Sequence, residues 1–561
     1  MSSPQTSVST SSVGQSNSLS INSLLGGDKW GGATGTGASL SYSFPWTSSS
    51  TAVFSGHDGV GDYSSLNEQN ASSHYGLSTT QQVAARAALQ SWANVANLDF
   101  SEVADSSSNV GDIRFAWTSA TDTTSTGSAA WGWSTFPNSY WPSAGDVWIS
   151  TIASGATNTN WAVGSDNFGS LIHELGHALG LKHPFEGSVA LPAATDSTQY
   201  SLMSYTPAAH SLYVSVTHSG NTWSWSSYNI EPSTPMLYDI QAMQYLYGAN
   251  TGYNTGDNTY TFDPAVPFIK TLWDAGGKDT ISVSNFTLGC TIDLRPGSFS
   301  KVSYFDDISA PVTWTTAPPT PTYDGTDDLA IAYGCVIENA IGGSGNDTLT
   351  GNDANNSLDG GAGNDSIDGG AGIDTAVYSM GRASVSLTKT STGFTLTDNS
   401  KVAGTDTLQN VERFKFSDAG IALDLASTQA AGQTVMLLGA VLPGRLVFDK
   451  EKQALLGAAI DLFDQGFSLQ TLSGAVMRLP IWDVLTQKSA PTSTDIATYL
   501  LNNVNGAAPD ATTLASAVKS LNSETDFATQ GNFLWHLAES AVNQTRIDLV
   551  GLAATGLAYT V

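Results

Sequence analysis

The chain has 561 residues, of which only 12% are charged, and a length of this order accommodates about two to four domains. Acidic residues outnumber basic ones by 49 to 20, which gives a net charge of −29. Such a charge repels nucleic acid and anionic membrane surfaces, so these are excluded as partners. The excess of carboxylates suits a protein that gathers cations such as calcium, although solubility alone also accounts for it.

The first residues, MSSPQTSVSTSSVGQSNSLS, contain neither a basic nor an apolar segment and do not form an N-terminal signal peptide. Residues 1 to 19 are rich in Ser and Thr, and we expect them to be disordered. No apolar run approaches the roughly 18 residues that a membrane span needs. The two cysteines, Cys290 and Cys335, lack zinc-finger or redox spacing, which leaves both a thiol pair and a disulfide open.

The hydrophobic pattern predicts secondary structure along the first half of the chain. Residues 39–46 alternate as a half-buried strand does, and residues 79–96 carry apolar side chains at helical spacing after a Ser/Thr cap. The segments DIRFAW and DVWIST are typical of strands, and further helices are expected over 167–181 and 236–248, the last ended by Gly248. From about residue 251 the chain becomes rich in Gly, Asp, Asn and Thr.

Residues 173–184 read HELGHALGLKHP. On a helix, positions i and i+4 share a face, so His173 and His177 can bind one metal ion together. Gly180 permits a sharp turn that brings His183 back as a third nitrogen ligand. Three protein ligands and one water are the open coordination of a catalytic zinc ion, and Glu174 is placed to act on that water as general base.

The spacing HExxHxxGxxH is the metzincin pattern, in which a methionine turn lies below the metal. The segment YSLMSY places Met203 at a suitable distance after His183. The alternative interpretation is an ordinary amphipathic helix with surface or core histidines and a methionine that only packs in the core. The long motif makes this alternative the weaker one.

Four contiguous units of nine residues run from Gly342 to Val377 and follow the pattern GGxGxDxUx of a calcium-binding parallel β-roll. Glycines allow tight turns and expose carbonyls, while the Asp adds a carboxylate. The apolar positions are expected to form a thin inward-facing core: Leu349, Leu358, Ile367 and either Ala376 or Val377. The predicted calcium-binding residues are Gly343, Gly345, Asp347, Gly361, Gly363, Asp365, Gly370, Gly372 and Asp374. The second unit has Asn356 in place of Asp, so a weak or absent ion is expected there; a flexible linker is the alternative for the whole segment.

The segments HELGHALGLKHP, SLMSY, QYLYGAN, WDAGGKDT and IENAIGGSGND resemble those of the serralysins, secreted bacterial zinc endopeptidases with calcium-binding RTX repeats. The resemblance covers about residues 20–380. It implies that Tyr205 is a further zinc ligand that also stabilises the oxyanion of the tetrahedral intermediate. It also implies a substrate-binding edge strand within residues 128–134, where Trp131 and Trp133 line the cleft or are simply buried. An additional calcium site is implied at Gly256, Asp257, Asp274, Gly276, Gly277, Asp279 and Glu338.

The expected architecture is an α+β metzincin catalytic domain over 20–250, a parallel β-roll with flanking strands over 251–425, and a mainly helical C-terminal domain over 426–561. The expected function is a secreted zinc endopeptidase with one catalytic Zn²⁺ and several structural Ca²⁺. The resemblance implies export through a type I apparatus by a C-terminal signal, extracellular localisation and proteinaceous inhibitors as candidate partners. An extracellular location would favour a disulfide between Cys290 and Cys335. The alternative function is a non-catalytic adhesion protein that retains the fold.

Overall fold

The computed structural model describes residues 8–47, 52–54, 56, 62–106, 109–121, 130–153, 159–219, 222–305, 309, 314–400, 404–443, 452–524, 526 and 529–560. The chain divides into two compact units, Met1–Thr350 and Gly351–Val561. This division falls inside the nine-residue repeats, whereas the sequence predicted boundaries after residues 250 and 425. The two units are therefore described separately.

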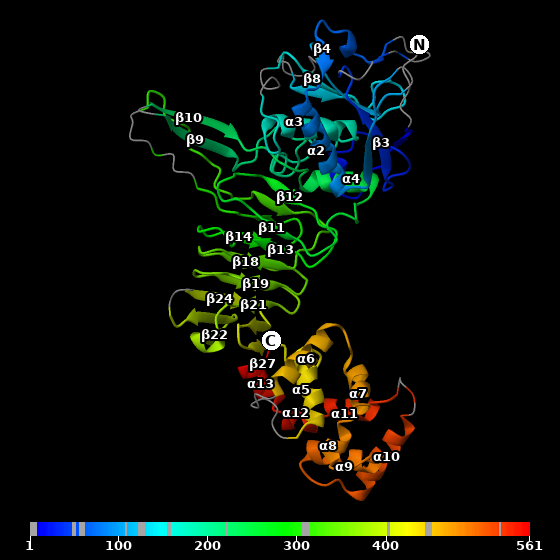
Figure 1. The fold of residues 1–561 in the computed structure, drawn as a ribbon, viewed down its shortest axis with the longest axis vertical. Coiled ribbons are helices and arrows are strands. Elements are labelled where there is room, and N and C mark those ends of the chain that lie inside the picture. Colours follow the sequence, from blue (N-terminus) through cyan, green and yellow to red (C-terminus); the bar gives the residue numbers. More distant parts are fainter. Residues whose placement is uncertain are drawn as a thin grey trace. The chain divides into compact units, whose positions relative to one another are not determined.

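The first unit contains a sheet with the strand order β5–β3–β6–β8–β7. Its strands are β3 (Ala38–Ser43), β4 (His74–Gly76), β5 (Leu98–Glu102), β6 (Ile113–Thr118), β7 (Gly132–Ser134) and β8 (Val147–Ser150). Figure 1 labels β3, β4 and β8 of this sheet. Strands β5, β3, β6 and β8 run parallel, β4 pairs antiparallel with β6, and β7 runs antiparallel to β8 at one end of the order. All residues of β6 and β8 are buried, so these strands form the centre of the core.

Three helices of this unit begin and end close to the predicted residues: α2 (Thr79–Val95), α3 (Asp166–Ala178) and α4 (Leu237–Tyr247). The short helix α1 (Leu19–Asn22) and the 3₁₀ turn η1 (Glu68–Asn70) were not predicted. A capping box starts α2, since Ser78 Oγ accepts from the Gln81 N–H and Gln81 Oε1 accepts from the Ser78 N–H. Helix α3 ends before Gly180, whose φ of 108° no longer continues a helix. Helices α2 and α3 pack against each other.

The N-terminal leader is partly ordered, which corrects the prediction of disorder for its described residues. Strand β1 (Thr10–Ser12) pairs antiparallel with β2 (Asp28–Trp30). The Ser11 hydroxyl donates to the Gly31 carbonyl, and Ser20 Oγ in α1 donates to Gln241 Oε1 in α4. Side-chain hydroxyls thus fix a segment whose composition alone suggested disorder. Residues 1–7 lie outside the described residues.

The first unit also contains a long hairpin that precedes α4 and a series of short strands that follow this helix. They are β9 (Leu212–Ser219), β10 (Thr222–Asn229), β11 (Thr259–Thr261), β12 (Lys270–Leu272), β13 (Thr280–Ser282), β14 (Thr291–Asp293), β15 (Phe299–Ser300), β16 (Leu329–Ile331), β17 (Asn339–Ile341) and β18 (Thr348–Thr350). Strands β11, β13 and β17 pair in parallel, and so do β14 and β18. Strand β12 pairs with β16, which also pairs antiparallel with β15. Parallel pairing of very short strands is consistent with the repeat pattern.

The second unit continues with short strands. They are β19 (Ser357–Asp359), β20 (Ser366–Asp368), β21 (Thr375–Val377), β22 (Val385–Lys389), β23 (Phe394–Asp398), β24 (Thr405–Gln409), β25 (Arg413–Lys415), β26 (Gly420–Ala422) and β27 (Leu557–Tyr559), with the 3₁₀ turn η2 (Arg382–Ser384). Parallel pairs join β19, β21 and β25, and also β20 and β24. In the two units Leu349, Leu358, Ile367 and Ala376 are at most 1% exposed, so Ala376 rather than Val377 is the inward residue of the last repeat.

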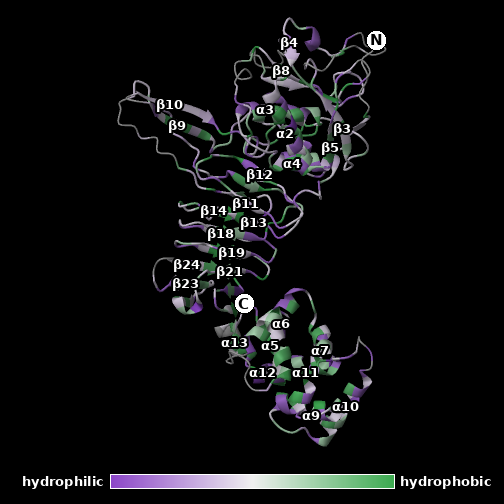
Figure 2. Ribbon diagram, viewed as in Figure 1, coloured by the Kyte–Doolittle hydropathy of each residue, from purple (hydrophilic) through white to green (hydrophobic). Residues whose placement is uncertain are grey.

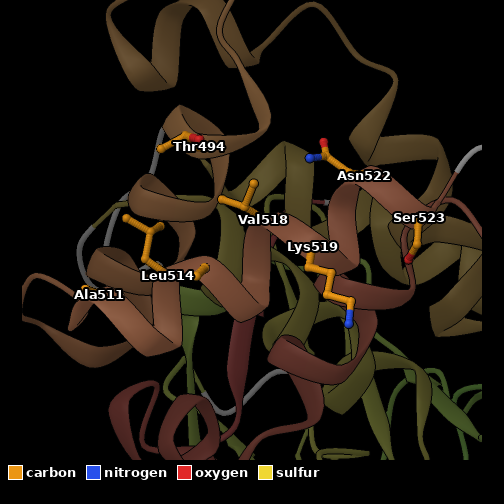
Figure 3. Close-up of a pocket in the computed structure, with 8 residues that line it drawn as sticks. Thr494, Ala511, Leu514, Val518, Lys519, Asn522 and Ser523 are labelled. Carbon is orange, nitrogen blue, oxygen red and sulfur yellow. The ribbon is translucent and has the colours of Figure 1, made fainter.

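The rest of the second unit is helical, as predicted. The helices are α5 (Ala430–Val441), α6 (Gln453–Asp464), α7 (Leu469–Met477), α8 (Trp482–Thr486), α9 (Ser493–Asn505), α10 (Ala511–Ser523), α11 (Asn532–Glu539), α12 (Ala541–Arg546) and α13 (Leu549–Thr555). Helix α5 is buried along nearly its whole length and is largely apolar in Figure 2. A pocket of about 710 Å³ lies beside α10, where Leu514, Val518 and Lys519 face it together with Thr494 of α9 (Figure 3). It carries no recognisable catalytic group.

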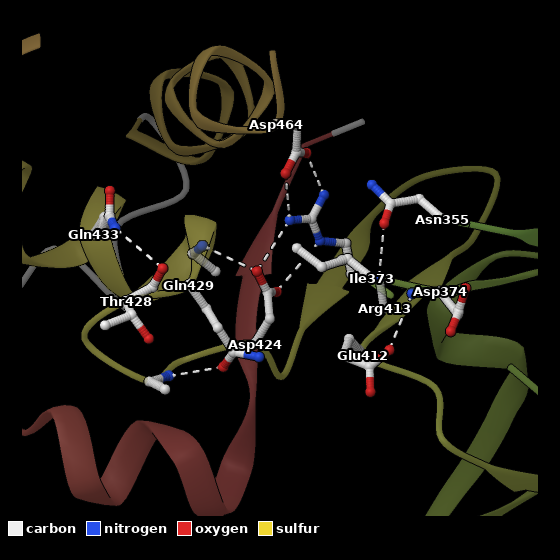
Figure 4. A network of polar contacts seen from close by, with 12 residues as sticks. Asn355, Ile373, Asp374, Glu412, Arg413, Asp424, Thr428, Gln429, Gln433 and Asp464 are labelled. Atoms are coloured by element: carbon white, nitrogen blue, oxygen red, sulfur yellow. Dashed lines mark hydrogen bonds and ion pairs between the residues drawn. The ribbon is translucent and has the colours of Figure 1, made fainter. Parts of the chain in front are cut away.

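The strands and helices of the second unit share one core, so the predicted boundary after residue 425 lies inside a compact body. Ala422, Leu425 and Leu557 belong to the same buried cluster as the α5 and α6 side chains. Strand β27 pairs antiparallel with β26. The guanidinium of Arg413 in β25 binds the carboxylates of Asp424 and of Asp464 in α6 (Figure 4). The tail, predicted only as a weakly apolar segment, thus ends in a strand.

The two cysteines are separate buried thiols in the structure, so the disulfide suggested as one alternative is not formed. Burial raises the pKa of Cys290 to about 11 and that of Cys335 to about 12. Among the described residues, no helix combines the length and apolar content needed to cross a membrane.

Candidate active site

Three imidazoles converge at the C-terminal end of α3. The Nε2 atom of His183 lies 3.3 Å from Nε2 of His173 and 3.1 Å from Nε2 of His177. One nitrogen from each ring lies within 4.8 Å of those of the other two, which is a geometry that can hold a metal ion. The sequence predicted this set of three residues, and the structure brings them together.

The hydrogen bonds of the opposite ring nitrogens define the tautomers. Nδ1 of His173 lies 2.8 Å from the Leu202 carbonyl, and Nδ1 of His177 lies 2.7 Å from the Leu181 carbonyl. Nδ1 of His183 lies 2.8 Å from Oε1 of Glu186. Because carbonyl and carboxylate oxygens only accept, each Nδ1 carries the proton and each neutral ring directs an Nε2 lone pair to the centre. Three lone pairs that face one another fit a cation, and the nitrogen donors fit zinc.

Burial favours the neutral form of the two helical histidines. Burial lowers the pKa of His173 to about 4, an effect that the hydrogen bond to Leu202 opposes and the neighbouring His183 strengthens. Burial also lowers the pKa of His177 well below its usual value, and the neighbouring His173 and His183 lower it further. Neutral imidazole is the form that binds a metal ion, so little proton competition is expected near neutral pH.

A methionine turn lies directly below the helix, as the sequence predicted. Met203 is fully buried, and a Cβ placed on Gly176 would lie 2.5 Å from its Sδ. The turn is held by Asp239 of α4, whose carboxylate accepts from Ser201 Oγ at 2.6 Å and from the Leu202 N–H at 2.7 Å. Asp239 was not predicted as a site residue, because no local motif links it to a turn that lies 37 residues earlier.

Of the two residues predicted to act on the substrate, Tyr205 lies against the histidine rings, and Glu174 is the neighbour of His173 on the same helix. Glu174 follows His173 on α3 and is 7% exposed, whereas Tyr205 is 65% exposed. The Tyr205 ring lies with its centroid 4.6 Å from that of His183 and 5.7 Å from that of His173. Phe185 stacks on His183 at 5.1 Å and also contacts Tyr205. No motif in the sequence indicated the position of Phe185.

Strand β7 is the edge strand of the sheet next to the site, within the predicted segment, of which residues 128 and 129 lie outside the described residues. Trp133 Nε1 donates to Oε1 of Glu68 at 2.8 Å, and Trp131 Nε1 donates to Oδ1 of Asn167 in α3 at 2.9 Å. Both indoles are half-buried. These hydrogen bonds attach the strand to α3 and to η1, so the two tryptophans have at least a structural role.

The predicted additional calcium residues also come together in the first unit. The Asp257 carboxylate accepts from the Lys278 N–H, and a Cβ on Gly277 would overlap the Gly256 carbonyl. Asp274 Oδ1 accepts from the Gly276 N–H, and Glu338 Oε2 accepts from the Asp279 N–H. Asp279 Oδ2 is buried and accepts no hydrogen bond among the described residues. Burial, then Asp274 and Glu338, raise the pKa of Asp279 to about 6, and this crowding of carboxylates fits a cation.

The repeat residues follow a regular hydrogen-bond pattern within each unit. Asp347 accepts from the N–H groups of Cys290 and Gly343, and Asp374 Oδ1 accepts from the Asn356 N–H. Asn356 Oδ1 accepts from the Asn352 N–H, as a carboxylate would. The glycines have the expected geometry: φ is positive at Gly361, Gly363, Gly370 and Gly372, while a Cβ at Gly343 or Gly345 would overlap neighbouring backbone.

The pattern continues beyond the repeats in two residues that the sequence did not indicate. Asp406 Oδ1 accepts from the Asp365 N–H, and Glu412 Oε2 accepts from the Asp374 N–H. Asp374 Oδ2 is buried without a hydrogen bond among the described residues. Burial, then Glu412 and Asp368, raise the pKa of Asp374 to about 7. The nine-residue period is broken before Asp406, so no repeat search could find this residue or Glu412.

The mixed sheet, the long helix with two histidines, the third histidine and the methionine turn have the arrangement that is typical of the metzincin metallopeptidases. The family model of the matrixins, Peptidase M10, matches residues 63–205. The model of the Peptidase M10 serralysin C terminus matches residues 238–310, and that of the RTX calcium-binding nonapeptide repeat matches residues 341–376.

Curated proteins named as serralysins or metalloproteases are similar to the chain. The chain is 33% identical over 356 residues to a serralysin of Proteus mirabilis, covering 58% of this chain and 62% of that protein. It is 34% identical over 343 residues to serralysin C of Dickeya chrysanthemi, covering 57% and 60%, and 33% identical over 298 residues to metalloprotease AprA of Pseudomonas entomophila, covering 49% and 54%. The chain thus spans less than two thirds of the length of these relatives.

The predicted resemblance to the serralysins is confirmed by these matches. The chain combines a matrixin peptidase segment, a serralysin C-terminal segment and RTX repeats. The matching repeat model is described as calcium-binding, and the AprA relative is described as a metalloprotease.

Proposed function

We propose that the protein is a secreted, calcium-stabilised zinc endopeptidase that hydrolyses peptide bonds in proteins. The observation that carries this proposal is the convergence of the three Nε2 atoms of His173, His177 and His183 beside Glu174. Tyr205 is proposed as a further zinc ligand. When bound, zinc would supply a Lewis acid that polarises the substrate carbonyl and lowers the pKa of water to about 7.

The side chains of the protein carry out the proton transfers. Glu174 accepts the proton of the attacking water and passes it to the leaving amine, as a general base and then a general acid. The Tyr205 hydroxyl donates to the oxyanion of the tetrahedral intermediate, where negative charge develops. Its exposed ring beside His183 gives it access to a substrate above the centre.

The substrate is proposed to bind as an extended segment along β7. An edge strand offers main-chain donors and acceptors to a peptide. Trp131 and Trp133 fix this strand to α3 and η1, which keeps the bound peptide in register with the histidines.

Calcium is proposed to bind in two regions. One comprises Gly256, Asp257, Asp274, Gly276, Gly277, Asp279 and Glu338, and the other the repeat residues of a parallel β-roll. We propose that residues 20–250 carry out catalysis, that residues 251–425 form the β-roll with its flanking strands, and that residues 426–561 form the helical region. Extracellular release through a type I apparatus is proposed from the similarity to serralysins.

Casein hydrolysis tests the proposal against the non-catalytic adhesion alternative. Wild type and Glu174→Gln are compared at equal zinc content, which is measured by atomic absorption. We expect Glu174→Gln to keep its zinc and to lose at least about 10³-fold in kcat, within the range of lost acid–base catalysis. Equal activity of the two proteins would contradict the role of Glu174, and zinc-loaded wild type without activity would favour the adhesion protein.

A further inference from the structure

Lys182, the residue before the third histidine, binds several main-chain carbonyls at once. Its Nζ lies 2.5 Å from the carbonyl oxygen of Ser23, 2.7 Å from that of Glu186, and 3.2 Å from those of His183 and Val189. An ammonium group has three N–H donors, and hydrogen bonds from a charged donor are about twice as strong as neutral ones. The side chain therefore acts as an internal cation that gathers carbonyls from two separate stretches of chain.

The first of these stretches is residues 23–26, which we call the N-terminal clamp. The Gly26 N–H donates to the Gly180 carbonyl, and the Lys182 N–H donates to the Leu24 carbonyl, both at 2.8 Å. Leu25 and Leu181 form an antiparallel bridge between these two bonds. Ser23 and Leu24 are fully buried. The clamp thus pairs with the turn that leaves α3 as a short strand would.

The second stretch is residues 180–189, which we call the zinc loop. It contains His183 and Glu186, the partner of His183 Nδ1, and its Leu181 carbonyl accepts from His177 Nδ1. The loop thus orients two of the three imidazoles, whereas His173 is oriented by Leu202. Lys182 binds the carbonyls of His183, Glu186 and Val189. It therefore fixes the loop at His183 itself and at two later positions, Glu186 and Val189.

We propose that Lys182 is a positioning residue, whose ammonium group holds the zinc loop against the N-terminal clamp and keeps His183 in the metal-binding position. The clamp is then part of the metal centre, although it lies about 150 residues before α3 ends. Lys182 does not touch the three Nε2 atoms, so its effect on zinc passes through the backbone. The inference rests on the proposed zinc site and adds a residue outside its ligand set.

The test uses the full chain with Lys182→Cys in calcium-containing buffer. Zinc affinity is measured by competition with a chelator of known affinity, and casein hydrolysis at saturating zinc. We expect zinc binding about 10-fold to 100-fold weaker, the range for lost partners that orient ligands, with activity largely regained at excess zinc. Lys301→Cys is the matched control, because Lys301 binds only the surface carboxylate of Asp324 among its described ionic partners.

Chemical rescue distinguishes the effect of the ammonium charge on zinc affinity from the effect of the side chain's length and shape. Alkylation of the thiol introduced by Lys182→Cys with 2-bromoethylamine restores a side chain of lysine length with an ammonium group, whereas iodoacetamide gives a neutral one. Cys290 and Cys335 are buried and have raised pKa values, so they stay unmodified, which mass spectrometry checks. We expect zinc affinity to return to within about threefold of wild type only after aminoethylation, since only this group restores the charged donors.

Three outcomes would overturn the inference: zinc affinity of Lys182→Cys within twofold of wild type, equal rescue by both reagents, or an equal fall in Tm with and without zinc. The last result would show a purely structural role. Failure of the proposed function is distinguishable, because a wild type that binds zinc but hydrolyses no casein contradicts the peptidase and leaves the zinc-affinity comparison valid. An active wild type with unchanged zinc affinity in Lys182→Cys contradicts only the inference.

Discussion

Asp239 in α4 and Leu202 in the methionine turn are joined by a buried hydrogen bond of 2.7 Å between carboxylate and main-chain N–H. The carbonyl of the same Leu202 accepts the Nδ1 proton of His173. One residue of the turn therefore connects a helix outside the motif to a proposed zinc ligand, and the orientation of that ligand depends on a carboxylate outside the proposed ligand set.

Asp239→Asn tests this connection. The Oδ2 atom accepts from the Leu202 and Met236 N–H groups and Oδ1 accepts from Ser201 Oγ. The amide replaces one of these two oxygens by an N–H₂ group, so either Ser201 loses its acceptor or both main-chain N–H groups do. We expect zinc affinity to fall at least about tenfold, as for other partners that orient ligands. Chelator competition measures it, with the exposed turn residue Asp263→Asn as control. Unchanged zinc affinity in Asp239→Asn would show that the turn holds His173 without this carboxylate.

Alanine substitutions at two glycines of the zinc loop allow the cost of backbone strain to be measured apart from the cost of steric overlap. Gly180 has φ of 108° and Gly187 has φ of 78°, and an alanine costs about 1–2 kcal/mol at such angles. A Cβ at Gly180 would also lie 2.6 Å from the Asp28 carbonyl, whereas none lies within 4 Å at Gly187. We expect Gly180→Ala to lower the unfolding free energy by about 3 kcal/mol or more and Gly187→Ala by about 1. Denaturant melts measure both, and equal losses would refute the overlap.

The calcium sites predict opposite pH behaviour with and without the ion. The pKa values of Asp279 and Asp374 are raised to about 6 and about 7 in the folded protein. The folded state without calcium thus binds more protons than the unfolded state between pH 4 and 7, so its stability falls as pH rises through this window. We expect the Tm of EDTA-treated protein to be lower at pH 8 than at pH 5.

Calcium should reverse this trend, because the ion binds the deprotonated carboxylates. Protons compete with calcium below the raised pKa values, so calcium affinity should increase from pH 5 to pH 8. Isothermal titration at the two pH values measures it, and scanning calorimetry in excess calcium gives the matching Tm. A calcium affinity that is flat across this range would contradict the assignment of Asp279 and Asp374 as ligands.

Asn356→Asp tests the irregular second repeat. Asn356 Oδ1 already accepts the Asn352 N–H, and its own N–H donates to Asp374, so an aspartate fits the same position. The added charge should increase calcium affinity and, because it lies near Asp374, destabilise the calcium-free protein. The exposed Asn399→Asp in the same unit adds the same charge away from these turns. We therefore expect Asn356→Asp to lower Tm without calcium and to raise it with calcium, and Asn399→Asp to show no such reversal. The hypothesis fails if the two variants change Tm in the same direction under both conditions.

The sequence predicts those parts of the site that depend on local spacing. His173 and His177 are one helical turn apart and Gly180 permits the turn to His183, so the three ligands could be named without a structure. The nine-residue period likewise indicates Asp347, Asp365 and Asp374. Such features need no knowledge of distant partners, because the chain itself brings the residues together.

The remaining features depend on contacts between distant segments. Asp239, the N-terminal clamp and Lys182 act through hydrogen bonds that span 37 and 159 residues. Asp406 and Glu412 continue the carboxylate pattern after the period has ended. The prediction of disorder for residues 1–19 does not hold for the described residues 8–19, since Ser11 and Ser12 find hydrogen-bond partners at Gly31 and Asp28 only in the folded protein.

Strand β27 and the bonds of Arg413 have a consequence for how the second unit comes apart. The segment between β26 and β27 contains all the α-helices described in this unit, so it begins and ends at neighbouring strands of one sheet. Opening the helical bundle separates Asp464 from the buried guanidinium of Arg413, which then loses two hydrogen bonds and keeps only the carboxylate of Asp424 among its described ionic partners. The later repeats and the helices should therefore melt in a single cooperative transition, and a protease cut near residue 445 should leave the two fragments associated.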